Sequence, residues 1–289
     1  MLKYLKHEEI DLAKWDACIE QAPNGLVYAY SVYLNHMARH WDALVLNDYE
    51  AVMPLTWNKK LGISYLYQPP FVACGGVFGK NFNVDEFIKA IPKKFRLIEI
   101  NLNAGNSVHS AQLRNNFVLP LAKSYEEIYS NYRDNVKRNI KKAAGCAVKT
   151  GIDIDQIITL AKEQLSTVVN IDDDDMHRFK KLSENLQSKT YGVFSPSGEL
   201  LASCVYFFSH NRAYYILVGN HPNGKTLGAS HYLIDRFIAD HAGSNLLLDF
   251  EGSDIRNLAF FYSSFGATAE VYPALRINRL PWYAKLFKS

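Results

Sequence analysis

Apolar residues recur along this chain with two different spacings, and clusters of turn-forming residues separate the segments. Residues 10–21 carry apolar side chains at the spacing of an amphipathic helix. Residues 41–46 and 50–57 are rich in strand-forming residues, and Asn47 begins a turn signal between them. Helix-type and strand-type segments continue to alternate up to a last strand at 268–278. The pattern predicts a mixed α/β fold.

The pattern of predicted elements occurs twice. Residues 41–103 read as strand, turn, strand, strand, loop, helix and strand, and residues 191–252 read in the same order. The alternative is a chance similarity between two α/β stretches. Two copies of one mixed unit, joined by a helical segment, explain a length of 289 residues. We therefore expect an N-terminal unit over 1–122 and a C-terminal unit over 123–289, which begins with a basic linking helix.

The linking segment is predicted as one long helix over residues 124–144. Ser124 is a suitable N-cap, Glu127 is its capping-box partner, and Gly145 ends the pattern. The second half of this helix is strongly basic, which suits contact with tRNA, a lipid-linked phosphate or a membrane surface. A solvated helix face is the simpler interpretation. The acidic run 172–175 is interpreted as a surface turn.

Residues 214–267 hold the densest group of candidate functional residues. A predicted strand stops at a glycine-bearing turn, and a helix follows directly. The first N–H groups of a helix have no intrahelical partner, so such a turn favours a phosphate or another anion. A helix start with a solvated lysine is the alternative. The residues assigned to the anion site are Asn223, Gly224, Lys225, Gly228, Ala229 and Ser230.

The segment that follows this helix contains three candidates for proton transfer. Tyr262 is a candidate general acid, although it is also one of four aromatic residues in a short helix that needs a buried face. Asp249 and Glu251 end a predicted strand, and alternation places their side chains on one face if the strand reaches Glu251. We expect Glu251 to accept a proton and Asp249 to have a structural role, with helix capping as the alternative for either carboxylate.

Composition limits the partners and the compartment. The excess of 32 basic over 29 acidic residues gives a net charge of only +3, which argues against a protein built around a nucleic-acid backbone. The four cysteines are far apart and lack metal-ligand spacing, so we expect reduced thiols and no metal. No segment is typical of a signal peptide or a spanning helix. These observations predict a cytoplasmic location.

Four motifs resemble those of a known family. Lys225-Thr-Leu-Gly228-Ala-Ser230 resembles the Arg/Gln-x-x-Gly-x-Gly/Ala loop of the GNAT acyltransferase superfamily, and Tyr262-Ser-Ser-Phe-Gly266-Ala267 resembles its Tyr-x-x-x-Gly-Phe ending. Asp249-Phe-Glu-Gly252 and Lys137-Arg-Asn-Ile-Lys-Lys142 resemble segments of the tandem-domain FemABX peptidyl transferases. The chain departs from these patterns at Lys225, Ser230 and Ala267. The long helical arm of some peptidyl transferases is not visible.

The resemblance implies two tandem GNAT-like mixed-sheet units. It also implies an enzyme that moves an acyl or aminoacyl group from acyl-CoA or aminoacyl-tRNA to an amine. A modest charge and the missing arm favour acyl-CoA, with coenzyme A as co-substrate, over tRNA. The acceptor is a small-molecule, cell-wall or lipid-linked amine. A catalytically silent GNAT-fold binding module is the alternative. Only the second half holds the loop, Glu251 and Tyr262 together, so we expect the donor there.

Overall fold

The computed structural model describes residues 1–109, 111–165, 171–252 and 254–281 of the chain. These residues form two compact units, Met1–Arg114 together with the segment from Val271 onward, and Asn115–Glu270. The first boundary lies before the expected position at 122, and the chain from Val271 groups with the first unit, whereas we expected it in the second. None of the described helices is both long and apolar enough to span a bilayer.

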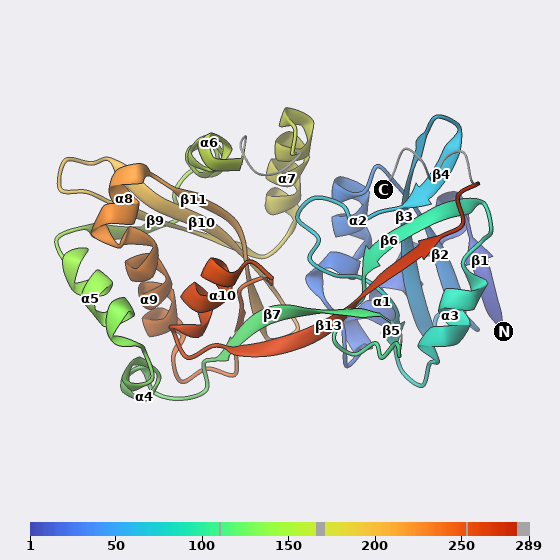
Figure 1. The fold of residues 1–289 in the computed structure, drawn as a ribbon, viewed down its shortest axis with the longest axis horizontal. Helices are drawn as coiled ribbons and strands as arrows, with labels where there is room; N and C mark the ends of the chain where they lie inside the picture. Colours follow the sequence, from blue (N-terminus) through green and yellow to red (C-terminus); the bar gives the residue numbers. More distant parts are fainter. Residues whose placement is uncertain (110, 166–170, 253, 282–289) are drawn as a thin grey trace. The chain divides into compact units, whose positions relative to one another are not determined.

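The first unit contains a mixed sheet (Figure 1). Its strands, in the order in which they lie side by side, are β1 (Leu2–Leu5), β2 (His40–Leu46), β3 (Ala51–Lys60), β4 (Ile63–Leu66), β6 (Phe95–Asn101) and β13 (Thr268–Asn278), and β5 (Phe78–Gly79) pairs with β3. Its helices are η1 (His7–Glu9), α1 (Leu12–Gln21), η2 (Val27–Ala29), α2 (Ser31–Met37) and α3 (Val84–Ala90).

The second unit has a sheet with helices on both faces. Its strands, in spatial order, are β8 (Ala147–Thr150), β9 (Ser188–Phe194), β10 (Leu200–Ser209), β11 (Arg212–Asn220), β12 (Leu247–Asp249) and β7 (Gln112–Pro120). Two helices, α6 (Ile154–Leu165) and α7 (Asp173–Asn185), cover one face (Figure 1). The opposite face is covered by α4 (Tyr125–Ser130), α5 (Asp134–Lys142), α8 (Pro222–Leu227), α9 (Ala229–His241) and α10 (Arg256–Ser263).

The expected repeat of strand order is confirmed. In the first unit β2, β3 and β4 are antiparallel neighbours and β4 is parallel to β6. In the second unit β9, β10 and β11 are antiparallel neighbours and β11 is parallel to β12. Each sheet also has an antiparallel strand beside its last strand. This strand is β13 beside β6 and β7 beside β12.

The additional antiparallel strand of each sheet lies after the other repeat in the chain. β7 directly follows β6 in sequence but pairs with β12, and β13 follows the β12 region but pairs with β6. This exchange moves both boundaries away from those predicted, because a sequence pattern of consecutive elements does not reveal which sheet a strand joins.

The predicted long helix at 124–144 is wrong as a single helix. The structure has α4 and α5, and Arg133 between them has an extended backbone. The Arg133 N–H donates to the Ser264 carbonyl at 2.9 Å, and the buried Tyr132 ring packs 5.3 Å from Phe265. These tertiary contacts outweigh a continuous helix pattern. The Ser124 capping box with Glu127 is confirmed.

The acidic run at 172–175 is also different from the prediction. Asp172 is the N-cap of α7, and Asp173, Asp174 and Asp175 form its first turn. Carboxylates at the N-terminus of a helix interact favourably with the helix dipole, so the run starts a helix and is not a surface turn.

The core of the second unit fixes the helix that carries the predicted anion loop. Leu233, Ile234, Phe237 and Ile238 of α9 are fully buried in this core. The Phe237 ring stacks on Tyr206 of β10 with 3.8 Å between ring centroids. Burial of each such side chain contributes about 1.5–3 kcal/mol, so α9 and the loop before it have a fixed position on the sheet.

Candidate functional site

The site is built where two parallel strands of the second unit separate. β11 and β12 are paired only between Arg212–Tyr214 and Leu247–Asp249. β12 ends at Asp249, whereas β11 continues to Asn220. The pairing of β10 with β11 shifts between Val205 with Leu217 and Tyr206 with Tyr215, so Ile216 is an extra residue that forms a β-bulge. The strands therefore leave an opening beyond Tyr214.

A cavity of about 400 Å³ occupies this opening. Its walls come from β11, from α8 and the turn after it, from the first turn of α9, and from α10. The lining residues are Tyr215, Val218, Asn220, Gly224, Lys225, Gly228, Ser230, His231, Leu258, Phe261 and Tyr262. Phe261 lines the cavity and does not fill it.

The structure brings four of the six predicted loop residues to this cavity, namely Gly224, Lys225, Gly228 and Ser230. The other two have different environments. The Asn223 amide lies 3.2 Å from a Glu199 carboxylate oxygen, and Ala229 is fully buried in the core. Asn223 and Ala229 are not part of the cavity wall.

The two glycines have packing roles that the sequence did not reveal. A Cβ atom on Gly224 would lie 2.1 Å from the Leu201 carbonyl oxygen of β10. Gly228 has a left-handed backbone with φ +75°, and a Cβ atom there would lie 2.7 Å from the Asn139 carbonyl oxygen of α5. Both contacts are too close for any side chain. Only glycine at these positions lets α8 and α9 lie against their neighbours.

The segment predicted as one helix start is divided between two consecutive helices. α8 is a short helix that ends at Gly228, and α9 begins at Ala229. The Ser230 hydroxyl in the first turn of α9 donates to the Asn220 side chain at the end of β11. The first backbone N–H groups of α9 have no partner within their own helix, and the exposed Lys225 adds a positive charge at the cavity mouth.

His231 was not predicted as a site residue, although it lines the cavity. Its Nε2 lies 3.3 Å from Nδ2 of Asn139, and its ring makes an edge contact with Phe261 at 4.7 Å. Burial, with a smaller effect of the Lys142 ammonium, lowers the pKa of His231 to about 4. The imidazole is therefore neutral at physiological pH. Because the Asn139 amide donates to Nε2, the ring proton lies on Nδ1.

Tyr262 is a buried residue of the cavity wall. It is 8% exposed, lines the cavity and stacks on Phe250 with 4.6 Å between ring centroids. Burial, and secondly the charge of Glu251, raise the pKa of Tyr262 above its ordinary value. The phenol is therefore protonated at neutral pH and can donate a hydrogen bond.

Glu251 is near Tyr262 but its geometry differs from the prediction. β12 ends at Asp249, and Glu251 has φ +60°, so strand alternation does not place Asp249 and Glu251 on one face. The Glu251 N–H instead donates to Asp249 Oδ1 at 2.8 Å in a tight turn. Glu251 does not line the cavity wall, and its charge is the second cause of the raised pKa of Tyr262.

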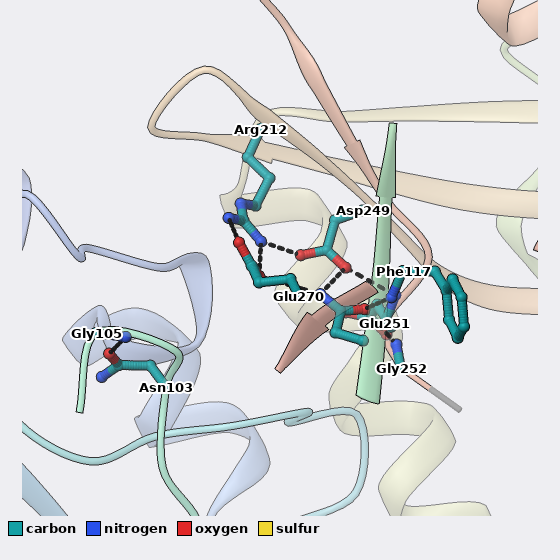
Figure 2. A network of polar contacts seen from close by, with 9 residues as sticks. Asn103, Gly105, Phe117, Arg212, Asp249, Glu251, Gly252 and Glu270 are labelled. Atoms are coloured by element: carbon teal, nitrogen blue, oxygen red, sulfur yellow. Dashed lines mark hydrogen bonds and ion pairs between the residues drawn. The ribbon is translucent and has the colours of Figure 1, made fainter. Parts of the chain in front are cut away.

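Asp249 belongs to a buried polar network (Figure 2). Arg212 Nη1 donates to Asp249 at 2.6 Å, and the Arg212 guanidinium makes two further hydrogen bonds of 2.9 Å to Glu270. The Asn116 amide donates to Asp249 at 2.9 Å and accepts the Gly252 N–H at 2.6 Å. The network fixes the turn that carries Glu251, which agrees with a structural role for Asp249.

In the first unit, the loop that corresponds to the Lys225 loop is filled by asparagine side chains. Asn103 Nδ2 donates to the Gly75 carbonyl at 2.9 Å, and Asn106 Oδ1 accepts the Val77 N–H at 2.7 Å. Asn24 Nδ2 donates to the Val77 carbonyl at 2.8 Å. A Cβ atom on Gly76 would lie 2.3 Å from the Asn106 side chain. The N–H groups of Gly75, Val77 and Gly79 donate to Asn101, Asn106 and Asn24 respectively, so these three donors are not available to an anion.

Comparison with known proteins gives structural matches. No family model and no curated protein sequence matches the chain. The fold is similar to that of FemX, with a TM-score of 0.65 and 13% identity over 98% of this chain and 99% of that one.

Two further structures are similar over 96% of this chain. The C-terminal domain of an Agrobacterium fabrum protein named as a lysylphosphatidylglycerol synthetase matches over 94% of its length, with a TM-score of 0.58 and 8% identity. The Saccharomyces cerevisiae N-myristoyltransferase with bound myristoyl-CoA matches over 80% of its length, with a TM-score of 0.50 and 12% identity. These similarities and the repeated strand order confirm the expected architecture, so the chain has a tandem GNAT-like fold that is similar to the fold of FemX.

Proposed function

We propose that the chain transfers an acyl or aminoacyl group from a carrier, bound in the cavity of the second unit, to an amine. The observation that carries this proposal is the convergence of Lys225, Ser230 and Tyr262 on one cavity at the separation of β11 and β12. The similar structures include an N-myristoyltransferase with bound myristoyl-CoA, which supports acyl-CoA as the carrier. Lys225 and the first turn of α9 would hold its phosphate groups.

The chemistry requires little covalent participation by the protein. The amine nitrogen attacks the carbonyl carbon of the donor, and the bond from that carbon to the carrier's sulfur or oxygen then breaks. Glu251 would accept the proton that the amine loses through a bridging water, because Glu251 does not itself line the cavity. The rate gain comes mainly from holding the two reactants together and from hydrogen bonds to the charge that develops.

Tyr262 suits hydrogen bonding to the leaving atom better than complete proton transfer to sulfur. A thiol has an ordinary pKa near 8.5. The pKa of Tyr262 is raised above its ordinary value by burial and by Glu251. Transfer of its proton to a thiolate is therefore unfavourable. A hydrogen bond from the phenol to the thiolate lowers the barrier without that transfer, and solvent protonates the released thiolate.

Isothermal titration with coenzyme A, acetyl-CoA and an aminoacyl-tRNA tests the proposal. We expect saturable binding of coenzyme A and acetyl-CoA by the wild type, and weaker binding by Lys225→Glu, which reverses a charge at the cavity mouth. The matched control is Lys181→Glu, because Lys181 is an exposed lysine of α7 in the same unit. Binding without turnover for any amine would favour the silent binding module. Binding of the tRNA alone would contradict acyl-CoA as the donor.

A further inference from the structure

The cavity has an open end and a closed end. Lys225 is exposed and Leu258 is 40% exposed, so these two residues mark the mouth. Tyr215 is only 4% exposed and lies directly after Tyr214, the last residue of β11 that pairs with β12. The ring of Tyr215 therefore lies at the inner end of the cavity, where the two strands begin to separate.

The β-bulge places Tyr215 on the cavity wall. In a regular strand the side chains of residues 214, 216, 218 and 220 share one face, and Tyr215 points to the other face. The extra residue, Ile216, shifts this alternation. As a result Tyr215 lines the cavity together with Val218 and Asn220.

The Tyr215 ring has no room to move away from the cavity. Its centroid lies 5.4 Å from that of Tyr206, which is fully buried, and 6.1 Å from that of Phe250. Phe250 is held by its stacking on Tyr262. A ring that is backed by close-packed aromatic side chains cannot change its rotamer without disturbing them.

We propose that Tyr215 limits the length of the group that is transferred. The inference rests on the proposed function, and it narrows the donor to carriers of short acyl or aminoacyl groups. A carrier that enters from the mouth brings its acyl group toward the inner end, where Tyr215 and Tyr262, with Phe250 packed behind them, close the space. A fatty acyl chain would have to displace this aromatic group, whereas a short group fits in front of it.

The test is a binding series by isothermal titration with coenzyme A and with acetyl-, butyryl-, octanoyl- and lauroyl-CoA, below their micelle concentrations. For the wild type we expect tight binding of acetyl-CoA and at least about tenfold weaker binding of lauroyl-CoA, the size of discrimination that a closed apolar pocket provides. Tyr215→Ala should bring the two dissociation constants within about threefold, while Tyr215→Phe keeps the ring and the preference.

Two further variants serve as a control and as a replacement. Tyr232→Ala removes a tyrosine of α9 that does not line the cavity, and should keep the wild-type preference. Tyr215→Leu replaces Tyr215→Ala if the latter does not fold, as judged by its circular dichroism and melting temperature.

Each remaining outcome is decisive. Equal or tighter binding of lauroyl-CoA by the wild type would overturn the length limit and leave the proposed function intact. A preference that persists in both Tyr215→Ala and Tyr215→Leu would overturn the assignment to Tyr215. Absence of binding for coenzyme A and every acyl-CoA would remove the proposed donor, and this inference with it.

Discussion

Arg212 of β11 and Asp249 of β12 form a buried ion pair, with 2.6 Å between Nη1 and Oδ2 (Figure 2). The pair lies in the short segment where the two parallel strands are joined, next to the opening that becomes the cavity. The same guanidinium binds Glu270. Because these contacts end the paired segment and hold the turn to Gly252, they set the position of both Glu251 and the cavity's inner end.

Loss of Arg212 should strongly destabilise the second unit. Arg212→Met leaves Asp249, which is 3% exposed, without its cationic partner. An uncompensated buried charge costs about 3–5 kcal/mol. Urea unfolding should show a loss of this size. The control is Arg236→Met, which breaks the more exposed pair of Arg236 with Asp240 on α9 and should cost at most about 1 kcal/mol. Equal effects of the two variants would show that the network does not stabilise the fold.

Substitution of Gly228 should destabilise the fold as well as weaken ligand binding. Gly228→Ala places a Cβ atom in a left-handed conformation and within 2.7 Å of the Asn139 backbone. Gly243→Ala is the matched control, because Gly243 has a similar φ of +77° and no atom within 4 Å of its Cβ position. The free energy of unfolding of this control should fall by about 1–2 kcal/mol because of the left-handed backbone conformation alone. Gly228→Ala should lose more in thermal or urea unfolding.

An equal loss of stability in Gly228→Ala and Gly243→Ala would mean that α5 can move away from residue 228. If Gly228→Ala is the less stable of the two, then substitution of Gly228 is no clean probe of the anion site, because it also changes the packing against α5. Lys225 is the better position, since its exposed side chain can be changed without a packing defect.

Removal of the Tyr262 hydroxyl should reduce turnover with little effect on stability. Tyr262→Phe keeps the ring that stacks on Phe250 and removes the donor that we propose for the leaving atom. Loss of one such hydrogen bond lowers kcat by about 10²–10³-fold. The assay is steady-state release of the carrier once an amine acceptor is found. Tyr191→Phe, at a buried tyrosine outside the cavity, should keep wild-type turnover. A Tyr262→Phe enzyme with normal kcat would exclude this role.

His231 should make the protein less stable in mild acid. Its pKa is about 4 in the folded chain, below the ordinary value of 6.5, because burial disfavours the charged form. Between these two values the unfolded chain binds more protons than the folded chain, so stability falls as the pH drops from about 6.5 toward 4. Urea midpoints measured across this range should fall less steeply for His231→Gln than for the wild type.

The control for this pH effect is His177→Gln, which replaces an exposed histidine of α7. It should follow the wild-type curve. If His231→Gln and the wild type lose stability in parallel as the pH falls, His231 is not the group that titrates.

The sequence predicted those features that depend on local pattern. The order of elements along each repeat follows from hydrophobic spacing and turn residues, and the Lys225 loop was found because its glycines and lysine are close together in the chain. Its glycines nevertheless serve packing against Leu201 and Asn139, which no local pattern reveals.

Features that depend on contacts distant in the chain could not be predicted. The break before α5 depends on Arg133 and Ser264, and the network of Arg212 joins Asp249 with Glu270. β7 and β13 each pair in the sheet of the other repeat. The alternation of apolar and polar residues within a strand does not indicate which sheet the strand joins. The bulge at Ile216 had no sequence signal, since the strand reads as a continuous apolar run. Of these features, the bulge is the one that places a residue, Tyr215, on the cavity wall.

We expect the carrier to bind in the second unit, in the opening between β11 and β12. The most direct measurement is a crystal structure of the protein with coenzyme A. We expect density for the ligand in the cavity lined by Tyr215, Lys225 and Tyr262, with phosphate oxygens near Lys225 and the first turn of α9. Ligand density in the first unit, beside Gly75 and Asn103, with the second-unit cavity empty, would contradict the account.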